Sequence, residues 1–186
     1  MKINIHDIPP EGREVIFELD DFRLNGRVHS FRDTARENSV SPPEYIFKGP
    51  NPVRIRLSLE GVTVFIEGSA AGRYISQCSR CAEEAEMSLV VPLKMILKPK
   101  SDRGPEGALD EDMHFGFYSG TEIDCSEIVE EFMILALPYT VFCEPGCRGL
   151  CGVCGVNLNM EPCKCTKETG TKDERFKALE RLKNLN

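Results

Sequence analysis

Six of the nine cysteines lie in one short segment, CEPGCRGLCGVCGVNLNMEPCKC, which spans Cys143 to Cys165. Its other residues are mainly glycine, proline, asparagine and charged side chains, with few apolar residues to form a core. Burial of so few apolar groups cannot offset the entropy that such a chain loses when it becomes ordered. The segment therefore needs covalent or metal cross-links to hold one conformation.

The spacing of these cysteines favours metal. Cys151 and Cys154 form a C-x-x-C-G turn, in which Gly155 lets the backbone bend behind two converging thiolates. Cys163 and Cys165 follow nine residues later and complete a set of four. In an extended strand their sulfurs would share a face but lie too far apart for one tetrahedral ion, so we expect a local turn there.

Partners for the remaining two cysteines exist upstream, where a second C-x-x-C pair follows a strand-like run. Without the isolated Cys125, eight cysteines are left, the number that two four-thiolate zinc sites use. We predict two zinc ions, the first bound by Cys78, Cys81, Cys143 and Cys147 and the second by Cys151, Cys154, Cys163 and Cys165. Unpaired structural thiols and disulfides are the alternatives, and the division of ligands between the sites is open.

Composition bounds the class of protein. The chain has 186 residues, of which 41% are hydrophobic and 28% charged, as expected for one domain or one domain with a small lobe. No apolar run is long enough for a membrane span, and the N-terminal residues lack the apolar stretch of a secretory signal. We therefore expect a cytoplasmic protein with no membrane partner, a compartment in which clustered thiols stay reduced and hold metal.

Alternating apolar residues predict several strands. The clearest hairpin joins residues 53–59 to 62–66, and further strands are expected at 2–6, 12–19, 73–77, 86–97 and 114–118. Pro92 indicates an edge position or a bulge. Residues 32–52 are expected to form a loop or irregular excursion with a short strand near residues 45–47.

One helix is expected at residues 124–137, where Asp124 caps the start, Glu127 completes a capping box and Pro138 ends the helix. Its apolar stripe should pack on the sheet while Glu130 and Glu131 face water. Cys125 lies in its first turn with no base near it in sequence, so we interpret it as a small buried side chain rather than a nucleophile.

These elements predict an α+β fold: a mainly antiparallel β-sheet or barrel with one packed helix, a C-terminal cysteine-rich zinc lobe and a short terminal helix. The expected divisions are a β-rich domain at 1–142, the zinc lobe at 143–170 and the C-terminal helix at 171–186. That helix, roughly 173–183, places apolar residues at helical spacing among basic ones.

Charge is unevenly distributed along the chain, whose net charge is −7. Residues 106–142 contain no lysine or arginine but nine carboxylates: Glu106, Asp110, Glu111, Asp112, Glu122, Asp124, Glu127, Glu130 and Glu131. Residues 143–186 carry eight basic and six acidic residues. An acidic stripe repels phosphates and attracts basic proteins, although a solvated face that only aids solubility is the alternative.

Motifs for enzyme chemistry are not found. The three histidines are scattered away from the cysteines, and no phosphate-binding loop or hydrolase motif occurs. Sites of four thiolates are closed and structural, whereas catalytic zinc keeps an open position. We expect no enzyme activity.

The cysteine-rich half resembles a known family. The run from Ile134 to Pro138, the sequence from Cys147 to Asn159, the Cys163–Cys165 pair and the stretch from Asp173 to Leu179 are similar to the YceD family, the large ribosomal RNA subunit accumulation proteins. The resemblance extends upstream to the Cys78–Cys81 pair and covers most of the chain from about residue 53. Gly152 departs from a frequent proline, and Cys125 from a usual leucine.

This resemblance implies a cytoplasmic factor in ribosome biogenesis, whose zinc is scaffold. One interpretation is an assembly factor that contacts a basic ribosomal protein or a pre-ribosomal particle through the acidic stripe. A second is direct RNA binding through the basic C-terminal helix and the zinc lobe. A third is a thiol redox or metal-delivery protein.

Overall fold

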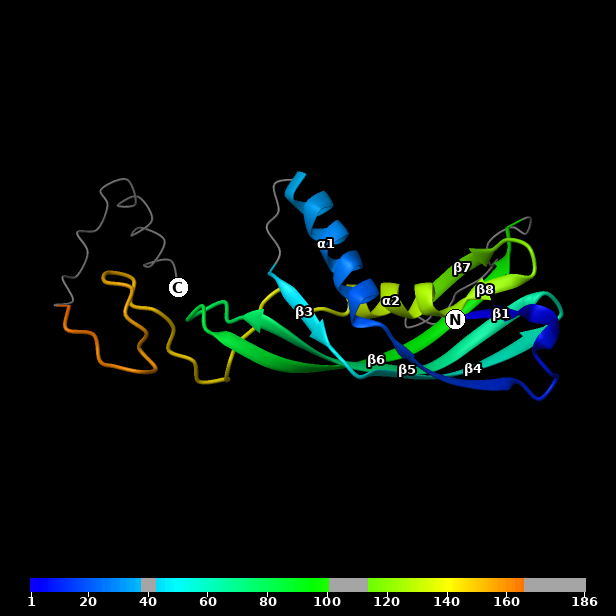
Figure 1. Cartoon of the computed structure of the whole chain (residues 1–186), viewed down its shortest axis with the longest axis horizontal. Coiled ribbons are helices and arrows are strands. Elements are labelled where there is room, and N and C mark those ends of the chain that lie inside the picture. The colour runs from blue at the N-terminus through cyan, green and yellow to red at the C-terminus, as the bar shows by residue number, and fades with distance from the viewer. Residues whose placement is uncertain (38–42, 101–113, 166–186) are drawn as a thin grey trace, which may run out of the picture.

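A six-stranded sheet forms the body of the molecule (Figure 1). The computed structural model describes residues 1–37, 43–100 and 114–165. The strand order is β2-β4-β5-β6-β7, and β3 also pairs with β5. The strands are β2 (Arg13–Leu19), β3 (Tyr45–Lys48), β4 (Asn51–Glu60), β5 (Thr63–Gln77), β6 (Glu84–Pro99) and β7 (His114–Tyr118). A separate pair joins β1 (Lys2–Asn4) to β8 (Glu122–Asp124).

The predicted α+β class is confirmed, with an open sheet in place of the barrel alternative. β4 and β5 form the predicted hairpin, and alternate residues of β4 such as Val53, Ile55 and Leu57 are buried. β6 and β7 are parallel, which departs from the mainly antiparallel pattern. Pro92 of β6 lies opposite Ser69 of β5, and among the described residues the pairing of β6 with β7 begins at Met95.

Two α-helices, α1 (Asp21–Glu37) and α2 (Cys125–Leu135), pack on the same side of the sheet (Figure 1). Asp124 caps α2 as predicted and accepts hydrogen bonds from the backbone of Ser126 and Glu127. α1 was not expected, so the predicted loop at residues 32–52 is wrong in its first part. A short helical turn, η1 (Ile5–Asp7), follows β1.

Helix α1 is polar, which explains why its pattern is weak. Only Leu24 and Val28, one helical turn apart, are fully buried among its described side chains. They join the same core as Val129 and Met133 of α2. The helix is therefore stabilised by a narrow apolar contact and by charge.

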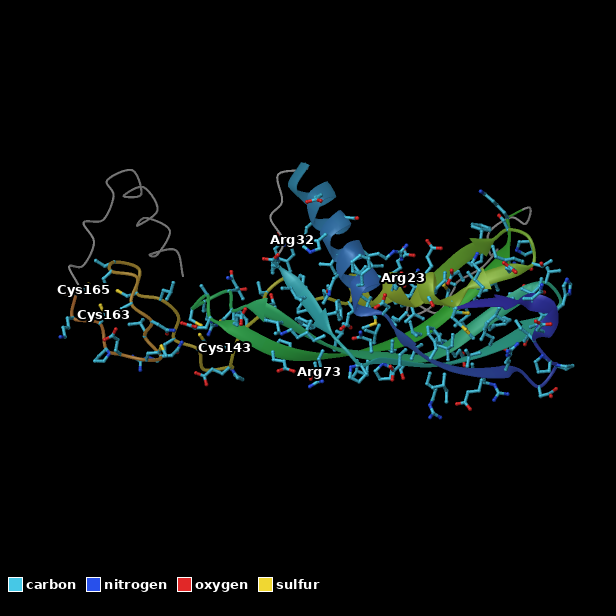
Figure 2. All side chains as sticks on the ribbon, in the orientation of Figure 1. Arg23, Arg32, Arg73, Cys143, Cys163 and Cys165 are labelled. Atoms are coloured by element: carbon cyan, nitrogen blue, oxygen red, sulfur yellow. The ribbon has the colours of Figure 1, made fainter. Side chains whose placement is uncertain are left out.

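The charged side chains of α1 show that the prediction for Glu130 is wrong. The side chain of Glu130 is 1% exposed rather than facing water, and it pairs with Arg23 (Nε to Oε1, 3.1 Å) and Arg27 (Nε to Oε2, 3.5 Å) of α1. Figure 2 shows Arg23 on the side of α1 toward α2. Burial raises the pKa of Glu130, and the two guanidinium groups oppose that rise. Glu131 is exposed, as expected.

The β5–β6 hairpin extends beyond the helices and carries the Cys78–Cys81 pair at its tip, next to the cysteine-rich segment (Figure 1). The predicted C-terminal helix and four residues of the acidic stripe, Glu106, Asp110, Glu111 and Asp112, lie outside the described residues. Within the described ranges, no helix is both long and apolar enough to cross a membrane.

Candidate metal centres

Eight cysteines gather in two groups of four. Cys78, Cys81, Cys143 and Cys147 form the first tetrad, and Cys151, Cys154, Cys163 and Cys165 form the second tetrad. Within each tetrad all sulfurs lie within 4.8 Å of one another. These are the two groups into which the sequence was divided, and no cysteine is in a disulfide. Each tetrad could hold a metal ion.

The sulfur spacings of the first tetrad suit a tetrahedral ion. In a tetrahedral site with Zn–S bonds of about 2.3 Å, neighbouring sulfurs lie about 3.8 Å apart. The Sγ atoms of Cys78 and Cys147 are 3.8 Å apart, and those of Cys81 and Cys143 are 3.7 Å apart. Each of these pairs takes one sulfur from the hairpin and one from the cysteine-rich segment, so a bound ion would join them.

Hydrogen bonds to β3 and to the tip of the hairpin position the chain that follows α2. The Tyr45 hydroxyl donates to the Pro138 carbonyl just after α2. Ser79 N–H donates to the Val141 carbonyl (2.7 Å), and Val141 N–H donates to Ser79 Oγ (3.1 Å). These contacts bring Cys143 beside the C-x-x-C turn.

Arg80 contacts the cysteine-rich segment around Cys147. Its guanidinium donates to the Cys147 carbonyl (3.0 Å) and lies 4.5 Å from the centre of the Phe142 ring. Its own carbonyl accepts from Leu150 N–H (3.0 Å). Gly149 has φ +74°, and a Cβ there would lie 3.0 Å from the Arg80 carbonyl oxygen, so this close approach requires glycine.

The second tetrad is built from loops. Gly155 has φ +74° and donates its N–H to the Cys151 carbonyl (2.9 Å), which closes the C-x-x-C-G turn. The Sγ atom of Cys163 lies 3.2 Å from that of Cys151 and 3.6 Å from that of Cys154. Cys165 N–H donates to Cys163 Sγ (3.3 Å), a local turn of the kind that the spacing required.

Asn157 and Asn159 lie in the loop between Cys154 and Cys163, and Asn159 contacts the first tetrad, a role that cysteine spacing could not reveal. Asn159 donates to Cys147 Sγ (3.3 Å) in the first tetrad and accepts from Arg148 N–H (2.7 Å). Asn157 Oδ1 accepts from the backbone and side-chain amides of Asn159 (both 3.0 Å). Such partners orient metal ligands. The Asn-Leu-Asn run was part of the resemblance, and that was the only signal for them.

One thiol in each tetrad has a pKa below its ordinary value. Burial opposes ionisation of Cys78, but backbone N–H groups of Cys143, Cys81 and Arg80 outweigh it and lower its pKa to about 6. Backbone N–H groups of Cys154 and Val153 lower the pKa of Cys151 to about 6.

In each tetrad the surroundings of another cysteine raise its thiol pKa instead. Burial and the neighbouring thiols raise the pKa of Cys143 to about 12. Hydrogen bonds with Cys163 and Cys154 raise the pKa of Cys165 to about 12. Four thiolates at these distances repel one another, so a cation is needed to ionise them all. The donor sets therefore fit a closed metal site.

Cys125 lies apart from both tetrads. It is fully buried at the start of α2, and burial raises the pKa of its thiol to about 11. The raised pKa makes it a poor nucleophile.

Replacement of Cys125 by alanine should leave both metal equivalents in place. The variant loses only a small buried group, so we expect a cost of about 1 kcal/mol in the free energy of unfolding. Metal analysis and chemical denaturation would check this. Loss of a metal equivalent would overturn the eight-ligand assignment.

Comparison with known proteins connects these cysteines to a family. The model of the family described as large ribosomal RNA subunit accumulation protein YceD matches residues 66–183. An uncharacterized protein of Mycobacterium tuberculosis is 30% identical over 110 residues, 59% of this chain and 51% of that protein. The chain thus spans about half the length of this relative.

Two plant proteins named chloroplastic large ribosomal RNA subunit accumulation protein YCED homolog 1 also match. That of Arabidopsis thaliana is 36% identical over 62 residues, 33% of this chain and 19% of the plant protein. That of Zea mays is 28% identical over 141 residues, 60% of this chain and 45% of the plant protein. No solved structure matches. Because the family match runs from within β5 through all eight clustered cysteines and covers well over half of the chain, this protein belongs to the YceD family.

Proposed function

We propose that this protein is a non-enzymatic cytoplasmic factor that supports accumulation of large-subunit ribosomal RNA, and so ribosome biogenesis, through protein contacts on a zinc-stabilised scaffold. The family match over residues 66–183 is the observation that carries the proposal. The wider arrangement that we propose is the β-rich domain at 1–142, the zinc lobe at 143–170 and a C-terminal helix at 171–186.

Zinc is the metal that the donor chemistry favours. Four thiolates in a tetrahedral arrangement select zinc or iron among common metals, and closed zinc sites of this kind stabilise folds without catalysing reactions. Both tetrads offer four sulfurs and no histidine or carboxylate. We assign one zinc ion to each tetrad, with a structural role.

The acidic surface supports a basic protein as the direct partner. Three of the nine carboxylates are already engaged, because Glu130 is buried between arginines, Glu127 pairs with Arg27 (3.0 Å) and Asp124 caps α2. Glu122 and Glu131 are exposed and make no ion pair with any described residue.

These two free carboxylates border a groove between β7 and α2. The groove has a volume of about 440 Å³, and its apolar part includes Met95, Leu97 and Ile128. Glu122, Asp124, Glu127 and Glu131 line it, and among the described residues no lysine or arginine does. An apolar floor with an acidic rim suits the long side chains of a basic protein, whose methylenes can pack while their charged ends pair.

Neutralising the acidic stripe should weaken binding of this partner. In one variant Glu106, Asp110, Glu111 and Asp112 become serine or asparagine, and in a second Glu122 and Glu131 become glutamine. Each should reduce capture of basic ribosomal proteins from the native cytoplasm and lower large-subunit ribosomal RNA in cells, with metal content unchanged. Capture by the unmodified protein should weaken as salt rises.

A matched variant tests RNA binding instead. Arg175, Lys177 and Arg181, in the basic C-terminal part of the sequence, are replaced by glutamine. If this change abolishes capture of ribosomal components and the acidic variants do not, direct RNA binding replaces the protein-contact proposal. Direct phosphate contacts would also show a steep loss of affinity for purified RNA with salt.

A further inference from the structure

The two tetrads are anchored very differently. In the first, Cys78, Cys81 and Cys147 are each 3% exposed and form their own buried cluster at the tip of the β5–β6 hairpin. Only Cys143 is exposed there. In the second, none of the four cysteines is buried, and Cys154 is exposed. Figure 2 shows Cys163 and Cys165 farther from the sheet than Cys143.

The chain around the second tetrad has little else to hold it. None of the apolar side chains of residues 148–165 joins the buried core, and Val153 and Met160 are 81% and 79% exposed. The backbone is closed by local hydrogen bonds such as Cys151 N–H to the Val156 carbonyl (2.8 Å), and a few others, such as Leu150 N–H to the Arg80 carbonyl (3.0 Å), tie the segment to the hairpin. Ligation of a metal therefore replaces a core in this segment.

Of the four sulfur–sulfur contacts described above, the shortest lies in the second tetrad. Cys151 Sγ and Cys163 Sγ are 3.2 Å apart, against 3.7 and 3.8 Å for the pairs of the first tetrad. The two residues are joined by a short loop without regular secondary structure. Such a pair can approach to bonding distance without moving a strand, whereas closure of the Cys78–Cys147 or Cys81–Cys143 pair in the first tetrad would move the hairpin against the cysteine-rich segment.

We propose that the second tetrad is an exchangeable metal site at which a peroxide forms a Cys151–Cys163 disulfide, while the first tetrad keeps its ion. This inference rests on the proposed metal binding. One thiolate attacks the peroxide, the O–O bond breaks, and a sulfenic acid and a hydroxide (or alkoxide) form. The second thiolate then attacks the sulfenic sulfur and displaces hydroxide. The two thiolates give up two electrons in total, the peroxide accepts them, and the metal leaves as a divalent ion.

The consequence would be a local change. Loss of the second ion releases residues 148–165, including Asn159, which supports Cys147. The sheet, both helices and the four sulfurs of the first tetrad keep their contacts with one another, because all of them lie outside residues 148–165; Cys147 loses only its hydrogen bond from Asn159. The cell could thus remove one surface of the protein under oxidation and restore it by reduction and metal uptake.

The test uses the full-length protein purified with two zinc equivalents and treated with hydrogen peroxide in the presence of a chromogenic zinc chelator. We expect release in two phases, the first of one equivalent and at least about tenfold faster than the second. Trapping of free thiols at the end of the first phase, followed by peptide mass spectrometry, should find Cys151 joined to Cys163 and the first tetrad unmodified.

Two matched variants locate the fast phase. Cys163→Ser should lose the fast phase and keep one slowly released equivalent, and Cys125→Ala should keep both phases. Release of both ions at one rate, survival of the fast phase in Cys163→Ser, or oxidation of the first tetrad before the second would overturn the inference. Peptide mapping of the unmodified protein decides the same question if a variant fails to fold. Protein purified without chelator that holds no zinc would instead contradict the proposed scaffold itself.

Discussion

Replacement of Cys147 by serine should remove one metal equivalent and strongly destabilise the end of the molecule that carries the hairpin tip. Cys147 is buried against Cys78, and the cluster around it consists of cysteines alone. Its loss therefore leaves no apolar core to hold the segment after Val141 against the hairpin. Metal binding at structural zinc sites contributes on the order of 10 kcal/mol, so the loss should exceed that of any single apolar contact.

Zinc analysis and limited proteolysis measure this effect. We expect about one zinc equivalent to remain at most, and rapid cleavage between residues 139 and 165. Cys151→Ser is the matched comparison, since it should also lose one equivalent but restrict new cleavage to residues 148–165. A Cys147→Ser protein that keeps two equivalents and resists protease would show that Cys147 is no ligand.

The cysteine groups were predictable because metal ligation imposes strict local spacing. Two C-x-x-C pairs and a count of eight favoured the same two groups that the structure brings together, although they left the division of the cysteines open. The linking of the groups was not predictable. It depends on hydrogen bonds from Asn159 and from the guanidinium of Arg80, and neither follows a spacing rule.

The strands were likewise predictable from alternation, whereas α1 was missed. Its buried side is narrow, and Gly26 lies in its middle, so neither periodicity nor helix propensity marks it. The error about Glu130 follows directly from the missed helix. A carboxylate on α2 faces water unless another element covers it, and the arginines that cover it come from α1, over a hundred residues away in sequence.

The same contact predicts a large effect of charge removal. In a protein with Arg23→Ala and Arg27→Ala, the carboxylate of Glu130 remains buried with neither partner. Removal of the partners of a buried charge commonly costs about 3–5 kcal/mol. Protonation limits this cost, because neutralising a carboxyl of ordinary pKa 4.5 at pH 7 takes about 3.4 kcal/mol. We expect a loss of about 3 kcal/mol in the free energy of unfolding at pH 7.

The pH dependence identifies the cause. In the folded state the pKa of Glu130 is already raised by burial, and loss of the arginines raises it further. When the pKa of a carboxyl is higher in the folded than in the unfolded protein, its contribution to stability is fully present below the pKa of the unfolded state. That contribution is lost as the pH rises through the pKa of the folded state. The deficit of the double variant relative to the unmodified protein should therefore be small near pH 4.5 and grow as pH rises. Both proteins contain the same tetrads, so loss of metal as the pH falls affects the stability of both proteins and not the difference between them.

Two further proteins separate charge from packing. Adding Glu130→Gln to the double variant removes the buried charge and should restore most of the stability at pH 7, with little dependence on pH. Glu127→Gln breaks only the ion pair with Arg27. Because the Glu127 side chain is 61% exposed, this change should alter the free energy of unfolding by less than about 1 kcal/mol. A double variant that is equally destabilised at pH 4.5 and pH 7, and that Glu130→Gln does not rescue, would mean that the arginines act through the packing of α1 on α2 rather than through the buried charge.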